Sequence, residues 1–87
     1  MVFMTYEIGY EMGDGRASRQ GTYNSKDELL SALNKMIEDD MKEYDLDFAS
    51  IVEPYIIFRS DGSQFYVEAR NNKLIFINEE TLEPDEI

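Results

Sequence analysis

The sequence predicts a single small α+β domain in which one amphipathic helix packs on a four- or five-stranded antiparallel sheet. Three patterns support this fold class. Apolar residues occupy every second position of residues 2–12, which is typical of a strand with one face in the core. Apolar residues then recur at spacings of three and four over residues 29–44, which is typical of an amphipathic helix. From residue 55 onward, short apolar runs are separated by turn signals, so the predicted order is ββαβββ.

The first two strands are predicted to form a hairpin. Asp14-Gly15 follows the first strand, and Asp-Gly favours the positive φ angles of a tight hairpin turn. The returning strand, residues 16–23, is polar and only weakly patterned. Its charges and Gly21 indicate an edge strand, because natural edge strands use such features to discourage pairing with other chains.

The predicted helix starts after Ser25. Ser25 and Glu28 have the S-x-x-E spacing of a capping box, in which each side chain satisfies a free backbone N–H. The apolar stripe of the helix consists of Leu29, Leu30, Leu33, Met36, Ile37, Met41 and Tyr44. We expect the helix to end near Asp45, after about five turns. Acidic residues crowd that end and oppose the helix macrodipole, which indicates that they serve something other than folding.

The C-terminal half is predicted to be a meander of three strands. Pro54 has no N–H to donate to a sheet, so the first of these strands is expected to begin just after it or to lie at an edge. Turns are expected at residues 60–63 and 71–72, where Asp-Gly and Asn-Asn tolerate left-handed backbone.

The last strand, residues 73–78, is expected to close a domain that spans residues 1–78. Residues 79–87 are mostly polar and acidic, and we expect them to form a flexible tail. Leu74–Ile77 is apolar at every position, so both faces of this strand need cover, and one helix covers only one face. Either the tail folds back over the second face or a second copy of the chain packs against it.

The chain contains no cysteine and no histidine. This excludes disulfides, thiolate zinc sites and cysteine nucleophiles, and it removes the commonest general base and metal ligand. Asp45-Leu46-Asp47 begins like a calcium loop, but residues 48–50 do not supply the further ligands of that motif. The first four glycines lie in a predicted hairpin, which is not the setting of a phosphate loop. We therefore expect a non-enzymatic protein without a catalytic residue, a cofactor or a metal ion.

No apolar run approaches the roughly 20 residues of a transmembrane helix, and the N-terminus lacks the basic region of a secretory signal. The expectation is a cytoplasmic protein that does not associate with membranes. Met4 is an alternative to Met1 as the start of the chain.

Negative charge is concentrated in two segments. Residues 38–47 and 79–86 hold 11 acids and one base, which accounts for −10 of the total formal charge of −11. A concentrated field selects cationic partners and repels nucleic acid, so we expect a basic protein surface as the partner and no direct nucleic-acid binding. The predicted partner-binding residues are Glu38, Asp39, Asp40, Glu43, Asp45, Asp47, Glu79, Glu80 and Glu83.

Two functional hypotheses follow. In the first, the chain is an acidic inhibitor or nucleic-acid mimic that occupies the basic site of a nuclease or a nucleic-acid-binding protein. Phage-encoded inhibitors and immunity proteins combine a similar size and charge, and the comparison rests on that analogy alone. In the second, the chain is a small structural or protein-interaction module. Its working surface would then be the apolar strand at residues 74–77, which could form a homodimer, and its acidity would serve only solubility.

Overall fold

The computed structural model describes residues 4–11 and 17–87. The elements are β1 (Tyr6–Glu11), β2 (Ala17–Tyr23), α1 (Lys26–Glu43), α2 (Phe48–Val52), β3 (Tyr55–Arg59), β4 (Gln64–Arg70) and β5 (Lys73–Asn78). The strands form one antiparallel sheet in the order β2-β1-β3-β4-β5. The predicted fold class and the order ββαβββ are confirmed, and α2 is an additional short helix. The predicted Asp14-Gly15 turn and Met1 lie outside the described residues.

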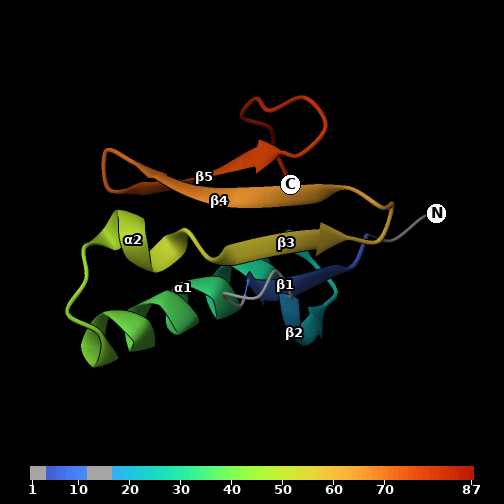
Figure 1. Cartoon of the computed structure of the whole chain (residues 1–87). Coiled ribbons are helices and arrows are strands. Elements are labelled where there is room, and N and C mark those ends of the chain that lie inside the picture. The colour runs from blue at the N-terminus through green and yellow to red at the C-terminus, as the bar shows by residue number, and fades with distance from the viewer. Residues whose placement is uncertain (1–3, 12–16) are drawn as a thin grey trace.

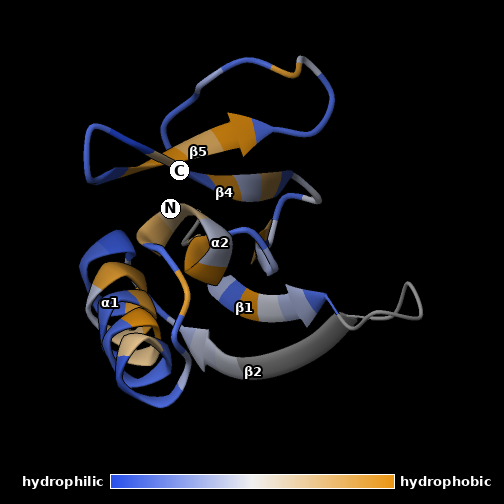
Figure 2. Cartoon of the chain, turned by 60° about the vertical axis from the view of Figure 1, so that its left-hand side comes forward, coloured by the Kyte–Doolittle hydropathy of each residue, from blue (hydrophilic) through white to orange (hydrophobic). Residues whose placement is uncertain are grey.

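The core lies between one face of the sheet and the two helices (Figure 1). Ile8, Ile57 and Phe65 are paired across three adjacent strands, and all three are buried. Because side chains alternate between the faces of a strand, this row defines the face that the helices cover. Figure 2 shows the hydrophobic side of α1 turned toward the strands. The other face of the sheet has no helix over it among the described residues, and we call it the open sheet face.

The first helix begins as the capping pattern predicts. The Glu28 N–H donates to the Ser25 Oγ at 3.1 Å, and Glu28 Oε2 accepts from the Asn24 N–H at 2.9 Å. The reciprocal bond therefore reaches one residue further back than in the standard capping box. Helix α1 buries Leu29, Leu33 and Ile37.

The last turns of α1 contribute little to the core. Met41 is 43% exposed and Tyr44 is 49% exposed, although both belong to the predicted apolar stripe. The buried part of the stripe ends at Ile37, and the helix itself ends at Glu43, close to the predicted end. The acidic end of α1 is therefore a solvent-facing projection of the domain.

Helix α2 was not predicted, because five residues are too few to show a helical period. Its N-cap is Asp47, whose Oδ1 accepts from the Ser50 N–H at 3.0 Å. Ile51 and Val52 are buried. The spacing of Asp47 and Ser50 is that of a side-chain cap, and it is the signal in the sequence that could have revealed the helix.

The predicted turns at residues 60–63 and 71–72 and the predicted edge strand are found. Gly62 has a φ of +94° in the 60–63 turn, and Asn71 and Asn72 have φ angles of 52° and 61°. Strand β2 lies at the edge of the sheet. Gly21, with φ +76°, is the extra residue of a β-bulge, because Glu7 and Ile8 of β1 pair with Thr22 and Gln20.

Strand β3 begins at Tyr55, directly after Pro54, and lies at the centre of the sheet. The Pro54 carbonyl accepts from the Glu11 N–H at 2.7 Å, which extends the pairing of β1 with β3 by one hydrogen bond. Proline is tolerated here because only its carbonyl is needed at this position.

Residues 79–87 turn back along the outer edge of β5. The Asn78 N–H donates to the Glu83 carbonyl at 3.0 Å, and the Asp85 N–H donates to the Phe76 carbonyl at 2.9 Å. Ile87 is 8% exposed, and its carbonyl accepts from the Tyr6 hydroxyl at 2.7 Å. The core thus extends past the boundary predicted at residue 78, while the mobility of the segment stays a prediction. Ile87 packs into the core on the helix side of the sheet, so the segment does not cover the open sheet face.

Among the described residues, the helices are too short or too polar to cross a lipid bilayer.

Candidate protein-binding surfaces

The nine predicted partner-binding residues form two groups at opposite corners of the molecule (Figures 1 and 2). The helix-end acids, near the end of α1, are Glu38, Asp39, Asp40, Glu43, Asp45 and Asp47. The loop acids, between β5 and the returning C-terminal segment, are Glu79, Glu80 and Glu83. A single partner groove would therefore contact one group or the other, because the domain body lies between them.

Three of the helix-end acids have partners within the chain. Asp40 accepts a hydrogen bond from the Tyr55 hydroxyl, and Asp47 caps α2. Glu38 lies 3.6 Å from the Lys42 ammonium in an exposed i,i+4 pair, as the sequence predicts. Hydrogen bonds from Ser50, first from its side chain and then from its backbone, hold the pKa of Asp47 below its usual value. These acids are part of the folded structure as well as of the negative surface.

The other three helix-end acids are Asp39, Glu43 and Asp45. All three are exposed, and none makes a hydrogen bond or an ion pair within the described residues. A carboxylate held by neither a base nor a backbone N–H is available to a cation from outside. They are therefore the part of the predicted site that the fold leaves open to a partner.

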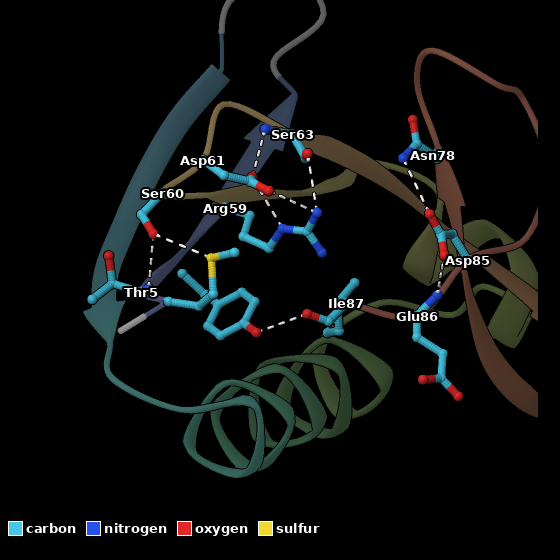
Figure 3. A network of polar contacts seen from close by, with 11 residues as sticks. Thr5, Arg59, Ser60, Asp61, Ser63, Asn78, Asp85, Glu86 and Ile87 are labelled. Atoms are coloured by element: carbon cyan, nitrogen blue, oxygen red, sulfur yellow. Dashed lines mark hydrogen bonds and ion pairs between the residues drawn. The ribbon is translucent and has the colours of Figure 1, made fainter. Parts of the chain in front are cut away.

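The loop acids lie on a turn with internal hydrogen bonds. The Glu80 N–H donates to Asn78 Oδ1 at 2.9 Å, and the Glu83 N–H donates to Thr81 Oγ1 at 3.3 Å. Asn78 also donates through Nδ2 to Asp85 at 3.3 Å (Figure 3). These bonds shape the backbone and leave the carboxylates of the loop acids exposed to solvent.

A pocket adjoins the helix-end acids. Its volume is about 300 Å³, and its described lining residues are Tyr10, Met36, Asp39, Asp40, Tyr44 and Tyr55. The rings of Tyr10 and Tyr55 are 5.3 Å apart between centroids and are inclined by 83°. Burial, followed by the hydrogen bond to Asp40 and its charge, raises the pKa of Tyr55, which therefore stays a neutral hydroxyl donor. We call this the tyrosine–aspartate pocket.

Sequence reasoning missed this pocket. The alternation of β1 and the stripe of α1 assigned Tyr10 and Tyr44 to the core, and Tyr55 to a buried strand. Three separate segments bring these rings together, and no local pattern carries that information. One signal in the sequence could have indicated the pocket. Tyr44 lies at the end of the acidic segment, where the core does not need an aromatic residue.

The open sheet face carries an apolar patch. Its members are Ile56, Phe58, Tyr66, Ile75 and Ile77. Tyr66 is 41% exposed and the others are half-buried. Ile56, Tyr66 and Ile77 are neighbours across three paired strands, so the patch is continuous. Contiguous apolar surface of this kind is a common feature of protein interfaces.

A groove of about 710 Å³ lies between α1, β5 and the C-terminal segment. Leu30, Leu74 and Phe76 contribute apolar lining. Its charged lining residues are Lys26, Lys73, Asp85 and Glu86, which balance in formal charge. The groove therefore shows no charge preference that would select a class of ligand.

Arg59 interacts with residues of the turn that follows it. It forms an ion pair with Asp61 at 2.8 Å, and its Nη2 donates to Ser63 Oγ at 3.2 Å (Figure 3). The guanidinium carbon lies 5.0 Å from the Phe65 ring centroid. The Arg59 hydrogen bond, with a further one from the Ser63 backbone, holds the pKa of Asp61 well below its usual value. This cluster stabilises the turn between β3 and β4.

Among the described residues, the acids do not converge in a group of three that could hold a metal ion. Comparison of the chain with protein-family models, curated proteins and solved structures gives no match. The surfaces themselves are therefore the basis for a functional proposal.

Proposed function

We propose that this protein is a non-enzymatic acidic binding protein that occupies a basic site on another protein and inhibits it. One observation carries the proposal: Asp39, Glu43 and Asp45 lie at one exposed corner without a partner among the described residues. The chain as a whole carries a formal charge of −11. Such a field attracts a cationic surface over distance and repels a polyanion.

The proposed class of target is a nuclease or another nucleic-acid-binding protein. These proteins carry grooves lined with lysine and arginine, because they must neutralise closely spaced phosphates. Asp39 and Glu43 are four residues apart on α1, which places them about 6 Å apart along the helix axis. A cationic groove that binds a row of phosphates would accept such a row of carboxylates.

Salt-dependent capture tests the proposal. The immobilised protein would be exposed to a cell lysate at low salt and eluted with a salt gradient, because screening weakens association between exposed charges. A variant with Asp39→Lys, Glu43→Lys and Asp45→Lys should lose the captured nucleic-acid enzymes. Glu38, Asp40 and Asp47 are left unchanged because each has a partner within the fold.

The matched control reverses the loop acids with Glu79→Lys, Glu80→Lys and Glu83→Lys, which changes the net charge by the same amount at the opposite corner. We expect this variant to retain most of the capture. Equal capture by the wild type and the helix-end variant, or retention that salt does not affect, would contradict the proposal.

The apolar patch on the open sheet face supports the second candidate function, an interaction module. Tyr66, Ile75 and Ile77 present a continuous apolar surface that a second copy of the chain could cover. The formal charge of −11 opposes self-association, so the dimer would have to be held by apolar contacts. A dimer in sedimentation experiments that persists at every salt concentration and is disrupted by Ile77→Glu would favour this function.

A further inference from the structure

We propose that the tyrosine–aspartate pocket receives one cationic side chain of the partner, and that an arginine fits it best. This inference rests on the proposed function and names the point of contact. The six lining residues that the structure describes are three tyrosines, one methionine and two aspartates, and none of the six is basic. The pocket thus combines aromatic surface with a formal charge of −2 from Asp39 and Asp40.

The aromatic walls are suited to a cation. The rings of Tyr10 and Tyr55 stand nearly at right angles, at 83°, with 5.3 Å between their centroids. The faces of aromatic rings attract ammonium and guanidinium groups, and methionine adds a polarisable sulfur to the lining. Tyr44 is 49% exposed, so ring surface remains open to a group that enters from solvent.

The pocket is held in place by contacts on each side. The Tyr55 hydroxyl donates to Asp40, which joins β3 to α1. The Tyr44 N–H donates to the Asp40 carbonyl at 2.8 Å, which anchors the residue at the end of α1. A site whose walls are positioned before binding loses less entropy when the ligand enters.

Within the part of the chain whose side chains the structure describes, no cation fills the pocket. Lys42 lies two positions from both Asp40 and Tyr44, but it pairs with Glu38. Neither Lys42 nor Lys35 is among the described lining residues. Asp39 has no hydrogen bond or ion pair within the described residues. Arginine is preferred to lysine because a planar guanidinium can stack on a ring and meet a carboxylate at the same time.

The test uses ethylguanidinium chloride as a probe and ethylurea as its neutral counterpart, at constant ionic strength. Ethylguanidinium should produce saturable changes in the NMR signals of the pocket residues Tyr10, Asp39, Asp40, Tyr44 and Tyr55. Ethylurea should produce none, because it lacks the charge. Changes that are spread equally over all exposed carboxylates, or that are absent, would overturn the inference.

Variants separate the pocket from general acidity. Asp39→Asn and Tyr44→Ala should each weaken probe binding by roughly fivefold, since each removes one attraction for the cation. Both positions are exposed, so the fold should tolerate these changes. The matched control is Asp45→Asn, which removes the same charge from the same corner outside the pocket and should have little effect. Equal weakening in Asp45→Asn and Asp39→Asn would contradict a specific site.

The two proposals can fail separately. Loss of salt-dependent capture in the helix-end reversal, together with no saturable probe binding, would leave the proposed function standing and overturn the pocket. Saturable probe binding without salt-dependent capture would support the pocket and overturn the proposed function.

Discussion

A glycine in β1 shows how one residue fits the open sheet face. Glu7, Gly9 and Glu11 point away from the helices, and only the middle one lacks a side chain. A Cβ built on Gly9 would lie 2.5 Å from Phe58 Cε2, so the ring of Phe58 occupies the space above the glycine. Gly9 is therefore needed because it leaves room for the Phe58 ring across β1 and β3. It is not needed for an unusual backbone conformation.

We predict that Gly9→Ala lowers the free energy of unfolding by about 1–3 kcal/mol, because the added methyl group overpacks the contact with Phe58. Urea denaturation followed by circular dichroism measures the change. The control is a double-mutant cycle with Phe58→Ala, in which removal of the ring should relieve most of the cost. Additive effects of the two substitutions would show that the ring is not the cause.

At the scale of the element, the cap of α2 links an acidic residue to folding. The carboxylate of Asp47 accepts from the Ser50 N–H, and hydrogen bonds from Ser50 lower its pKa from 3.8. A lowered pKa in the folded state stabilises the fold above the unfolded pKa. That contribution is lost as the pH falls through the folded value.

We therefore predict that Asp47→Ala lowers the melting temperature by a few degrees at neutral pH, because a helix cap is lost. The difference from the wild type should shrink as the pH falls from the unfolded value of 3.8 through the lower folded value, where the carboxylate of the folded wild type also becomes protonated. Thermal melts at several pH values measure this. Asp45→Ala, an exposed neighbour that caps nothing, is the control and should leave the melting temperature nearly unchanged. A difference that is independent of pH would contradict the role of the charge.

The acidic end of α1 has two roles that the structure separates. Asp40 and Asp47 support Tyr55 and α2, whereas Asp39, Glu43 and Asp45 have no such contacts among the described residues. These acids repel one another, and their charges oppose the negative C-terminal end of the helix dipole. Both effects reduce the stability of the last turns of α1. This destabilisation affects the part of α1 that projects past the core, and it is consistent with a role of the acids in binding.

At the scale of the whole molecule, the two ends of the described chain meet. The Tyr6 hydroxyl donates to the Ile87 carbonyl at 2.7 Å, and the Ile87 side chain is 8% exposed within the core. This contact closes the domain between β1 and the segment that follows β5 (Figure 3). Ile87 should therefore contribute to the stability of the entire fold.

We predict that Ile87→Asp lowers the free energy of unfolding by about 2 kcal/mol, because a buried apolar side chain is replaced by a charge. Chemical denaturation measures the change, with the exposed Glu86→Gln as a control. An unchanged denaturation midpoint would instead support the flexible tail that the composition of residues 79–87 predicts.

The parts of the fold that depend on near neighbours could be predicted from the sequence. The cap at Ser25, the burial of Leu29 and Leu33, and the turn at Asn71-Asn72 each follow from residues a few positions apart. The short helix α2 could not, because one and a half turns show no period, and its cap was considered only as the start of a calcium loop. The predicted site was located by charge, which identifies a segment but not its contacts.

The sequence by itself determined the fold class, the position of the elements other than α2 and the concentration of negative charge, because alternation, helical spacing and charge density are local properties. Only the tertiary structure decided which acids have partners in the fold and that the two acidic segments lie at opposite corners of the molecule. It also decided that Tyr10, Tyr44 and Tyr55 share a pocket with Asp39 and Asp40. These features arise where segments distant in the chain meet, and the meeting points are set by how the helices pack on the sheet.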